Sequence, residues 1–120
     1  MIIAISTTGN ELNQPVDPRF GRCKQFIIFD SSNESFEVID NKQNLNAAQG
    51  AGIQSAQTVA NSGAEALISG HCGPKAFKVL TQANIKVYTC KDLSIKEAIE
   101  KLLAGELSQS EDADVEGHWG

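Results

Sequence analysis

Short apolar and β-rich runs recur along the chain between polar turns. They predict strands over residues 2–5, 25–30, 35–40, 64–69 and 86–89. The turn residues between the second and third runs predict a hairpin. Because apolar and polar residues alternate in the third run, we expect it to be an outer strand. The continuous apolar first run is typical of a central strand that is covered on both faces.

Helical spacing of apolar residues predicts three helices in the second half of the chain. The first is expected near 50–62, and the second begins at Pro74. The third has a capping box formed by Ser94 and Glu97, and it stops at Gly105. The order is then βββαβαβα, which predicts a single α/β domain with a mixed five-stranded sheet. Its later strands should be parallel, because right-handed crossovers join them.

Two connections interrupt this pattern. Residues 7–22 form a long loop, and loops of that length in a compact domain are usually functional or disordered. Val16, Pro18 and Phe20 predict that this loop is ordered. Residues 41–46 predict a polar connection between the third strand and the first helix.

The chain has 120 residues, which fits one domain rather than two of ordinary size. Its core-forming pattern ends near Gly105, so we expect a domain over residues 1–105 and an acidic, flexible tail over 106–120. No apolar run approaches the roughly 18 residues that span a bilayer, and the N-terminus lacks a signal-peptide pattern. We therefore expect no membrane association and a cytoplasmic location.

The net charge is -5 at pH 7, but the charges are unevenly distributed. A small basic cluster contains Arg19, Arg22 and Lys24. Such a cluster is too small for the broad basic face of a nucleic-acid-binding protein. It is large enough to hold a small anion.

The three cysteines, Cys23, Cys72 and Cys90, are odd in number and widely spaced, which predicts reduced thiols or metal ligands rather than disulfides. In an open parallel sheet, ligands bind outside the carboxyl ends of the strands. The expected topology brings the ends of three parallel strands to one edge, together with the start of the antiparallel second strand. All three cysteines, His71 and the basic cluster should therefore lie near this edge.

The turn Ser69-Gly70-His71-Cys72-Gly73-Pro74 joins a strand to a helix. Cys72 would lie beside free helix N–H groups, which favour a thiolate. The charges of Arg19 and Arg22 would favour a thiolate at Cys23 in the same way. The alternatives are a loop cysteine at 72, a structural cysteine at 23 and a solvent-facing His71. For Cys90 we favour a strand-end cysteine without a functional role over a ligand, because small strand-end cysteines are common.

Two further segments also allow two interpretations. Asp17 can pair with Arg19 within the loop, or Arg19 can reach for an anion, and both can hold together. His118 lies near the end of the chain, where it is either part of a frayed terminus or an arm that completes a coordination shell. The sequence contains no Cys-x-x-Cys pair, phosphate-binding loop, dinucleotide fingerprint or serine nucleophile elbow. We therefore predict that the protein is not an enzyme.

Several motifs together resemble a known family. They are Val16-Asp17-Pro18-Arg19-Phe20-Gly21-Arg22-Cys23 with Phe26 and Asp30, then Gly50-Ala51-Gly52, then Ser69-Gly70-His71-Cys72-Gly73-Pro74-Lys75-Ala76-Phe77, and the ending Gly117-His118-Trp119. In this order they resemble the dinitrogenase iron-molybdenum cofactor biosynthesis family, and the likeness covers nearly the whole chain.

The resemblance implies a three-layer, ribonuclease H-like α/β fold without nuclease activity. It implies binding of an iron-sulfur or molybdenum-containing cluster, with a role as carrier or chaperone alongside partner proteins of cofactor biosynthesis. On the matching positions, Cys23, His71 and Cys72 become metal ligands, with His118 as an optional one. Arg19, Arg22, Gly70 and Gly73 become further contacts, since arginines balance an anionic cluster and N–H groups can bond its sulfides.

We expect no appended domain and no long insertion here, in contrast to the larger nitrogenase members, so a single small domain could serve another molybdenum or iron-sulfur pathway. Two other classes of function also stay open. One is a thiol-dependent enzyme or redox protein that uses Cys72, activated by the helix terminus and His71. The other is a regulatory module that docks a partner protein through the acidic tail or the sheet edge.

Overall fold

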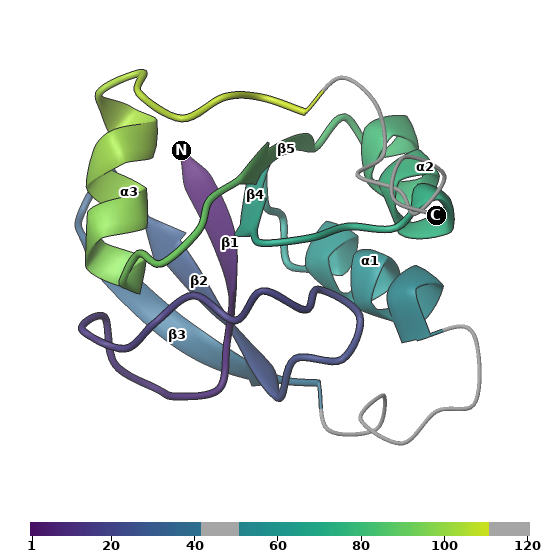
Figure 1. The fold of residues 1–120 in the computed structure, drawn as a ribbon, viewed down its shortest axis with the longest axis horizontal. Helices are drawn as coiled ribbons and strands as arrows, with labels where there is room; N and C mark the ends of the chain where they lie inside the picture. The colour runs from purple at the N-terminus through teal and green to yellow at the C-terminus, as the bar shows by residue number, and fades with distance from the viewer. Residues whose placement is uncertain (42–50, 111–120) are drawn as a thin grey trace.

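The structure, a computed structural model, describes residues 1–41 and 51–110. The elements are β1 (Ile2–Thr7), β2 (Gln25–Asp30), β3 (Ser35–Asp40), α1 (Ala51–Asn61), β4 (Ala66–Ser69), α2 (Pro74–Gln82), β5 (Lys86–Thr89) and α3 (Ile95–Leu103). The strands form a sheet in the order β3-β2-β1-β4-β5 (Figure 1). β2 is antiparallel to β1 and β3, whereas β1, β4 and β5 are parallel. Within the described ranges, the predicted α/β domain with a mixed five-stranded sheet and three helices is confirmed.

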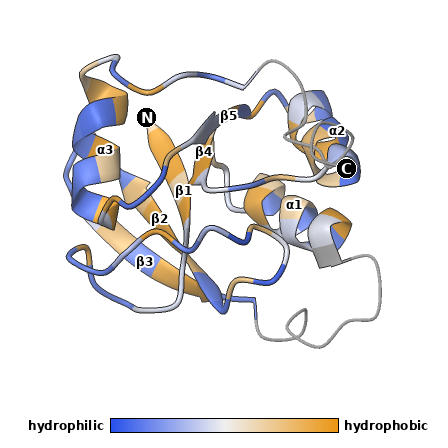
Figure 2. Ribbon diagram, in the orientation of Figure 1, coloured by the Kyte–Doolittle hydropathy of each residue, from blue (hydrophilic) through white to orange (hydrophobic). Residues whose placement is uncertain are grey.

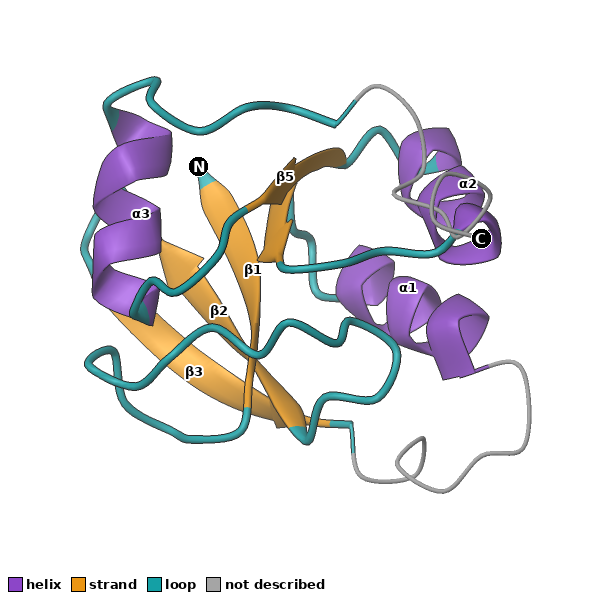
Figure 3. Cartoon of the chain, viewed as in Figure 1, coloured by secondary structure: helices purple, strands orange, loops and turns teal. Residues whose placement is uncertain are grey.

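Helices cover both faces of this sheet, so the domain has three layers (Figure 3). Successive strand residues point to opposite faces. Ala4 of β1 therefore packs with α1 and α2, whereas Ile3 and Ile5 pack with α3. Figure 2 shows β1 and β4 hydrophobic over most of their length, as expected of strands covered on both faces. Burying each large apolar side chain in these layers contributes about 1.5–3 kcal/mol.

Local signals set the ends of the helices. Glu97 N donates to Ser94 Oγ at 3.1 Å, and Ser94 N donates to Glu97 Oε1 at 2.9 Å, so the predicted capping box is present. Gly105 follows α3 with a φ of 75°, a conformation that glycine adopts without strain. α2 begins at Pro74, as the sequence predicts.

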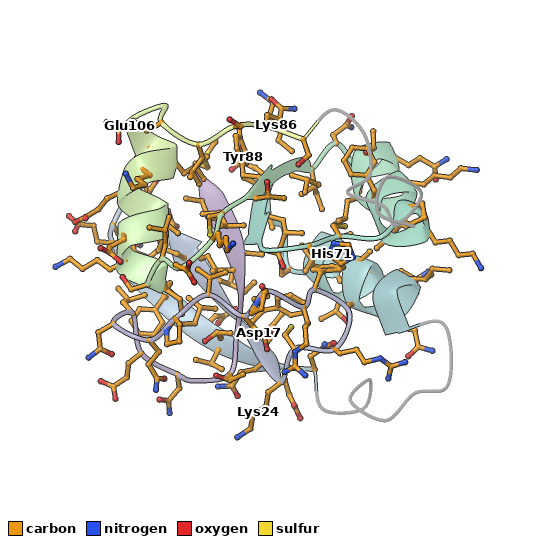
Figure 4. All side chains as sticks on the ribbon, in the orientation of Figure 1. Asp17, Lys24, His71, Lys86, Tyr88 and Glu106 are labelled. Atoms are coloured by element: carbon orange, nitrogen blue, oxygen red, sulfur yellow. The ribbon has the colours of Figure 1, made fainter. Side chains whose placement is uncertain are left out.

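The first residues of the predicted tail pack against the domain. Gln109 forms an antiparallel bridge with Tyr88, and Ser110 N donates to Val87 O at 2.7 Å. Leu107 packs against the core on the α3 side of the sheet. Residues 106–110 therefore lie along the outer edge of β5, above the sheet in Figure 4, where Glu106, Lys86 and Tyr88 are labelled.

Some predictions fall outside the described residues. They concern the helix start at Gly50, the connection over 42–46, the tail over 111–120 and the optional ligand His118. Within the ranges that are described, no helix is both long enough and apolar enough to cross a membrane.

Candidate anion-binding site at the carboxyl edge of the sheet

The predicted edge exists. Thr7, at the end of β1, pairs with Gln25 at the start of β2, and Ser69, at the end of β4, pairs with Thr89 at the end of β5. The ends of β1 and β4 are also joined by their side chains, because Ser6 Oγ lies 2.9 Å from Ser69 Oγ in the buried interior. The parallel and antiparallel directions on which the predicted convergence depended are therefore confirmed.

Residues 8–20, which we call the strap, cross this edge in an ordered conformation. Asp17 N donates to Ser6 O at 2.8 Å, and Val16 forms a bridge with Thr7. Phe20 is 2% exposed, and its ring centroid lies 5.5 Å from that of Phe26. Buried aromatic and backbone contacts thus hold the loop that the sequence predicted to be ordered.

Gly70 allows the strap to approach the end of β4 closely. A Cβ atom at this position would lie 2.5 Å from Pro18 Cα and 2.7 Å from Pro18 Cβ, which is closer than real contacts allow. Gly70 was predicted as a cluster contact, but its visible role is this packing. Gly73 differs, because a Cβ there would meet nothing within 4 Å.

Asp17 and Arg19 form the pair that the sequence suggested. The Asp17 carboxylate is buried, and it accepts hydrogen bonds from Arg19 N at 2.9 Å, Nε at 3.2 Å and Nη2 at 3.1 Å. These hydrogen bonds, together with the charge of Asp17, raise the pKa of Arg19. The hydrogen bonds to Asp17 fix the orientation of the Arg19 side chain. This side chain nevertheless stays 61% exposed, so much of its surface faces outward.

A cavity of about 690 Å³ lies beside this pair, on the α1 and α2 side of the sheet. The loop 19–22 and the first turns of α1 and α2 surround it. The lining residues are Arg19, Phe20, Gly21, Arg22, Gly52, Ile53, His71, Gly73, Pro74, Lys75 and Ala76. In Figure 4, His71 lies beside α1 and Asp17 lies on the strap, whereas Lys24 points away from the body of the molecule.

The electrostatics of this cavity favour an anion. Arg19, Arg22 and Lys75 line it, and none of the described residues in its wall is acidic. The positive end of α2 adds to this field, since this helix begins at the cavity. Apolar atoms of Phe20, Ile53 and Ala76 complete the wall. The cavity therefore suits a bulky anion better than a small hydrated one.

Two of the three cysteines lie in the core and not in the cavity wall. Cys23 is 0% exposed and Cys72 is 1% exposed, and both pack among apolar residues on the α1 and α2 side. Cys72 Sγ lies 3.8 Å from Gly73 O, a weak thiol contact with the adjacent carbonyl. His71, by contrast, is exposed and lines the cavity.

The prediction that arginine charges favour a thiolate at Cys23 is wrong. Burial and, to a smaller extent, the negative charge of Asp17 together raise the pKa of Cys23 to about 12. Desolvation penalises the charged form of a thiol, and the Arg19 charge is already paired with Asp17. Cys23 is therefore a neutral thiol at pH 7.

Cys90 lies on the other side of the strap. It lines a second cavity of about 660 Å³, together with Lys91, Leu93 and the strap residues Val16 and Pro18. Partial burial raises the pKa of the Cys90 thiol. Arg19 borders both cavities, so the strap separates Cys90 from the cavity that holds His71.

A preformed metal centre is not visible in the part of the chain that the structure describes, where no three His, Cys, Asp or Glu side chains come together to hold an ion. Of the predicted site residues, the structure brings Arg19, Arg22, His71 and Gly73 to one cavity. It places Cys23 and Cys72 behind that cavity, in the core.

Comparison with known proteins identifies the family. A family model described as dinitrogenase iron-molybdenum cofactor matches residues 1–105. The chain belongs to this family. An uncharacterised protein of Methanocaldococcus jannaschii is similar over 114 residues with 38% identity, which covers 92% of each chain.

Two solved structures resemble this family member. The apo form of the orange protein from Desulfovibrio gigas has a TM-score of 0.90 and 38% identity, covering 92% of this chain and 93% of that one. An NMR structure from Thermotoga, described as a candidate NifB protein of the DUF35 family, has a TM-score of 0.78 and 33% identity. That match covers 90% of this chain and 91% of the other.

Sequence reasoning missed Lys75 as a site residue of this family member. Lys75 stands in the first turn of α2, where a cation opposes the helix dipole. That unfavourable placement was the signal that could have found it. Sequence reasoning also missed the burial of Asn41, which was expected in a polar connection but is 0% exposed.

Proposed function

We propose that this chain binds an anionic iron-sulfur or molybdenum-containing cluster in the cavity beside Arg19, and carries it during cofactor biosynthesis without catalysing a reaction. The observation that supports this most is the cavity itself. Arg19, Arg22 and Lys75 converge there with the first turns of α1 and α2, and no described residue of its wall is acidic. A cluster with bridging sulfides offers many acceptors to arginine and backbone N–H donors.

The mode of binding follows from the burial of the thiols. Ionic contacts and hydrogen bonds can form with the cavity as it stands, whereas ligation by Cys23 requires a core thiol with a pKa of about 12 to lose its proton. We therefore propose that Arg19, Arg22, His71 and Gly73 contact the cluster directly. Ligation by Cys23, His71 and Cys72, with His118 as a further ligand, is the second form of the proposal. It requires the core behind the cavity to open.

The comparisons support the class of cargo. The family description names the iron-molybdenum cofactor, and one neighbour is described as an apo form, which implies a loaded form of that protein. We propose the same class of cargo here, with delivery to partner proteins of cofactor biosynthesis in the cytoplasm. The ribonuclease H-like label belongs to the proposal as well, and the strand order β3-β2-β1-β4-β5 with one antiparallel strand is compatible with it.

A thiol-dependent reaction at Cys72 receives less support. A nucleophilic thiol must reach its substrate, and Cys72 is 1% exposed. His71 is exposed and Cys72 is buried, so the two side chains of this pair lie in different environments.

The test is anaerobic titration with tetrathiomolybdate, a soluble molybdenum–sulfur anion, and separately reconstitution with ferrous iron and sulfide. Visible absorption and metal analysis measure uptake. Lys75→Gln should weaken tetrathiomolybdate binding about tenfold, because it removes a charged partner of the anion. Lys78→Gln, on the same helix but outside the cavity wall, is the matched control and should bind as the unmodified protein does.

Cysteine variants separate the two modes. Ionic binding predicts that Cys23→Ser and Cys72→Ser, if folded, retain uptake, whereas ligation predicts that each abolishes it. Binding that weakens with ionic strength supports the ionic mode, because salt screens exposed charges. Absence of stoichiometric uptake in both the tetrathiomolybdate and the iron–sulfide experiments would contradict the proposed function.

A further inference from the structure

Asn41 is a fully buried polar residue at the end of β3. Its Nδ2 donates to Cys23 O at 2.9 Å and lies 3.7 Å from Cys23 Sγ. Its backbone N donates to Lys24 O at 2.9 Å. One residue therefore binds two consecutive carbonyls of the turn 21–24, through its side chain and through its main chain.

The other end of the Asn41 amide reaches α1. Ser55 Oγ lies 3.1 Å from Asn41 Oδ1 and 3.2 Å from Gly21 O, so its single hydroxyl proton is within reach of both acceptors and is shared between them. Ser55 is itself 0% exposed. Asn41 and Ser55 thus connect three segments that are distant in sequence, namely the end of β3, the turn 21–24 and α1.

Two of these segments form walls of the anion cavity. Gly21 and Arg22 of the turn line one side, and Gly52 and Ile53 of α1 line another. Neither Asn41 nor Ser55 lines the cavity. These two buried residues can therefore influence a bound anion through the turn and the helix that they contact.

We propose that Asn41 is a positioning residue, which fixes the turn 21–24 against α1 so that Arg22 and the first turn of α1 stay correctly placed around the cavity. Its effect on ligand binding rests on the proposed function, whereas its effect on the turn does not. A buried amide suits this role because its donor and acceptor can serve two different segments at once, and an unpaired partner left in the core is unfavourable.

The first measurement uses the unliganded protein. Hydrogen exchange at the amide of residue 41, which donates to Lys24 O, should accelerate about tenfold in Asn41→Ala relative to the amides of α3. Ile99→Val, a conservative change in the core on the other face of the sheet, is the control for general destabilisation. If the exchange rates of amides across the whole domain rise by the same factor in both variants, Asn41 does not position the turn 21–24 specifically, and the proposal is overturned.

The second measurement is tetrathiomolybdate affinity. Asn41→Ala should weaken it about tenfold and Ser55→Ala about threefold, because the second variant keeps both contacts of Asn41 with the turn. Ile99→Val should leave it unchanged. If Asn41→Ala binds as tightly as Ile99→Val does, the positioning role is wrong. If the unmodified protein takes up no anion, the proposed function fails. Hydrogen exchange alone then tests whether Asn41 fixes the turn 21–24.

Discussion

α2 and α3 both begin at the carboxyl edge of the sheet, on opposite faces, and their N-termini are built differently. α3 has a capping box, an acidic Glu97 in its first turn, and N–H groups of Ile95 and Lys96 that donate to Gln14 O and Leu12 O of the strap at 2.8 Å each. α2 begins at Pro74 with Gly73 as its N-cap residue, has no side-chain cap among the described residues, and has no acid in its first turn.

The difference shows where the fold gains stability and where it keeps a site open. At α3, side chains and strap carbonyls satisfy the free N–H groups, which stabilises the helix. At α2, Gly73, Pro74, Lys75 and Ala76 line a cavity that two arginines also line, and no side chain caps this helix start among the described residues. A cation in the first turn opposes the helix dipole, and this arrangement becomes favourable when an anion binds.

The largest expected effect concerns the strap that links the two helix starts. Gly70→Ala places a Cβ 2.5 Å from Pro18 Cα, so the backbone of the strap must move. We expect the free energy of unfolding to fall by about 3 kcal/mol, as overpacking of a tight contact does. Chemical denaturation monitored by circular dichroism measures it.

Gly73→Ala is the matched control, because a Cβ at Gly73 meets nothing within 4 Å. It should change the free energy of unfolding by about 0.5 kcal/mol or less. Equal losses in the two glycine variants would show that the strap does not depend on close approach at Gly70.

The next effect converts the start of α2 into one like that of α3. Gly73→Asp places a capping carboxylate where φ is -72° and ψ is 171°, an extended conformation that suits an N-cap residue. Tetrathiomolybdate affinity should fall about 30-fold, or ~2 kcal/mol, because a carboxylate at the N-cap would accept from N–H groups of the first turn and repel the anion. Stability should rise by about 0.5 kcal/mol.

Gly73→Ser separates charge from capping. Serine caps the helix without adding a charge. It should therefore lower the anion affinity less than aspartate does, while stabilising the helix similarly. Isothermal titration calorimetry and thermal denaturation give both quantities. Unchanged affinity in Gly73→Asp would mean that the anion does not bind at this helix start.

Removing the cap of α3, the reverse of capping α2, should have a smaller effect. Ser94→Ala removes the cap of α3 and should lower the free energy of unfolding by about 1 kcal/mol. Anion affinity should stay constant, because Ser94 lies on the other side of the sheet edge and does not line the cavity. A parallel loss of affinity in titrations of this variant would argue that the two helix starts are coupled through the strap.

Much of this arrangement was predictable because it depends on neighbouring residues. The spacing of Ser94 and Glu97 predicted the cap of α3, and Pro74 predicted the start of α2. The convergence of strand ends at one edge follows from chain direction alone, once the crossovers are assigned. These inferences depend either on residues only a few positions apart in the sequence or on a general rule of topology.

The environments of Cys23 and Asn41 were not predictable in this way. Both are buried because Phe20 folds inward from the strap and α1 packs over the turn 21–24, contacts between segments far apart in the chain. A cysteine that follows two arginines predicts an activated thiol, and an asparagine that follows an outer strand predicts a polar loop residue. Burial reversed the first expectation by raising the pKa of Cys23 to about 12.

The smallest predicted effect is the pH dependence of the α3 cap. Hydrogen bonds from the Ser94 backbone and side chain lower the pKa of Glu97 below its ordinary value of 4.5. A carboxyl whose folded pKa is depressed stabilises the fold above its unfolded pKa, and this contribution is lost as pH falls through the folded pKa. The stability difference between the unmodified protein and Glu97→Gln should therefore be constant from pH 7 to about pH 5 and shrink below pH 4.5. Urea denaturation at each pH measures it, and a difference that persists unchanged to pH 2 would mean that the charge of Glu97 adds nothing to the cap.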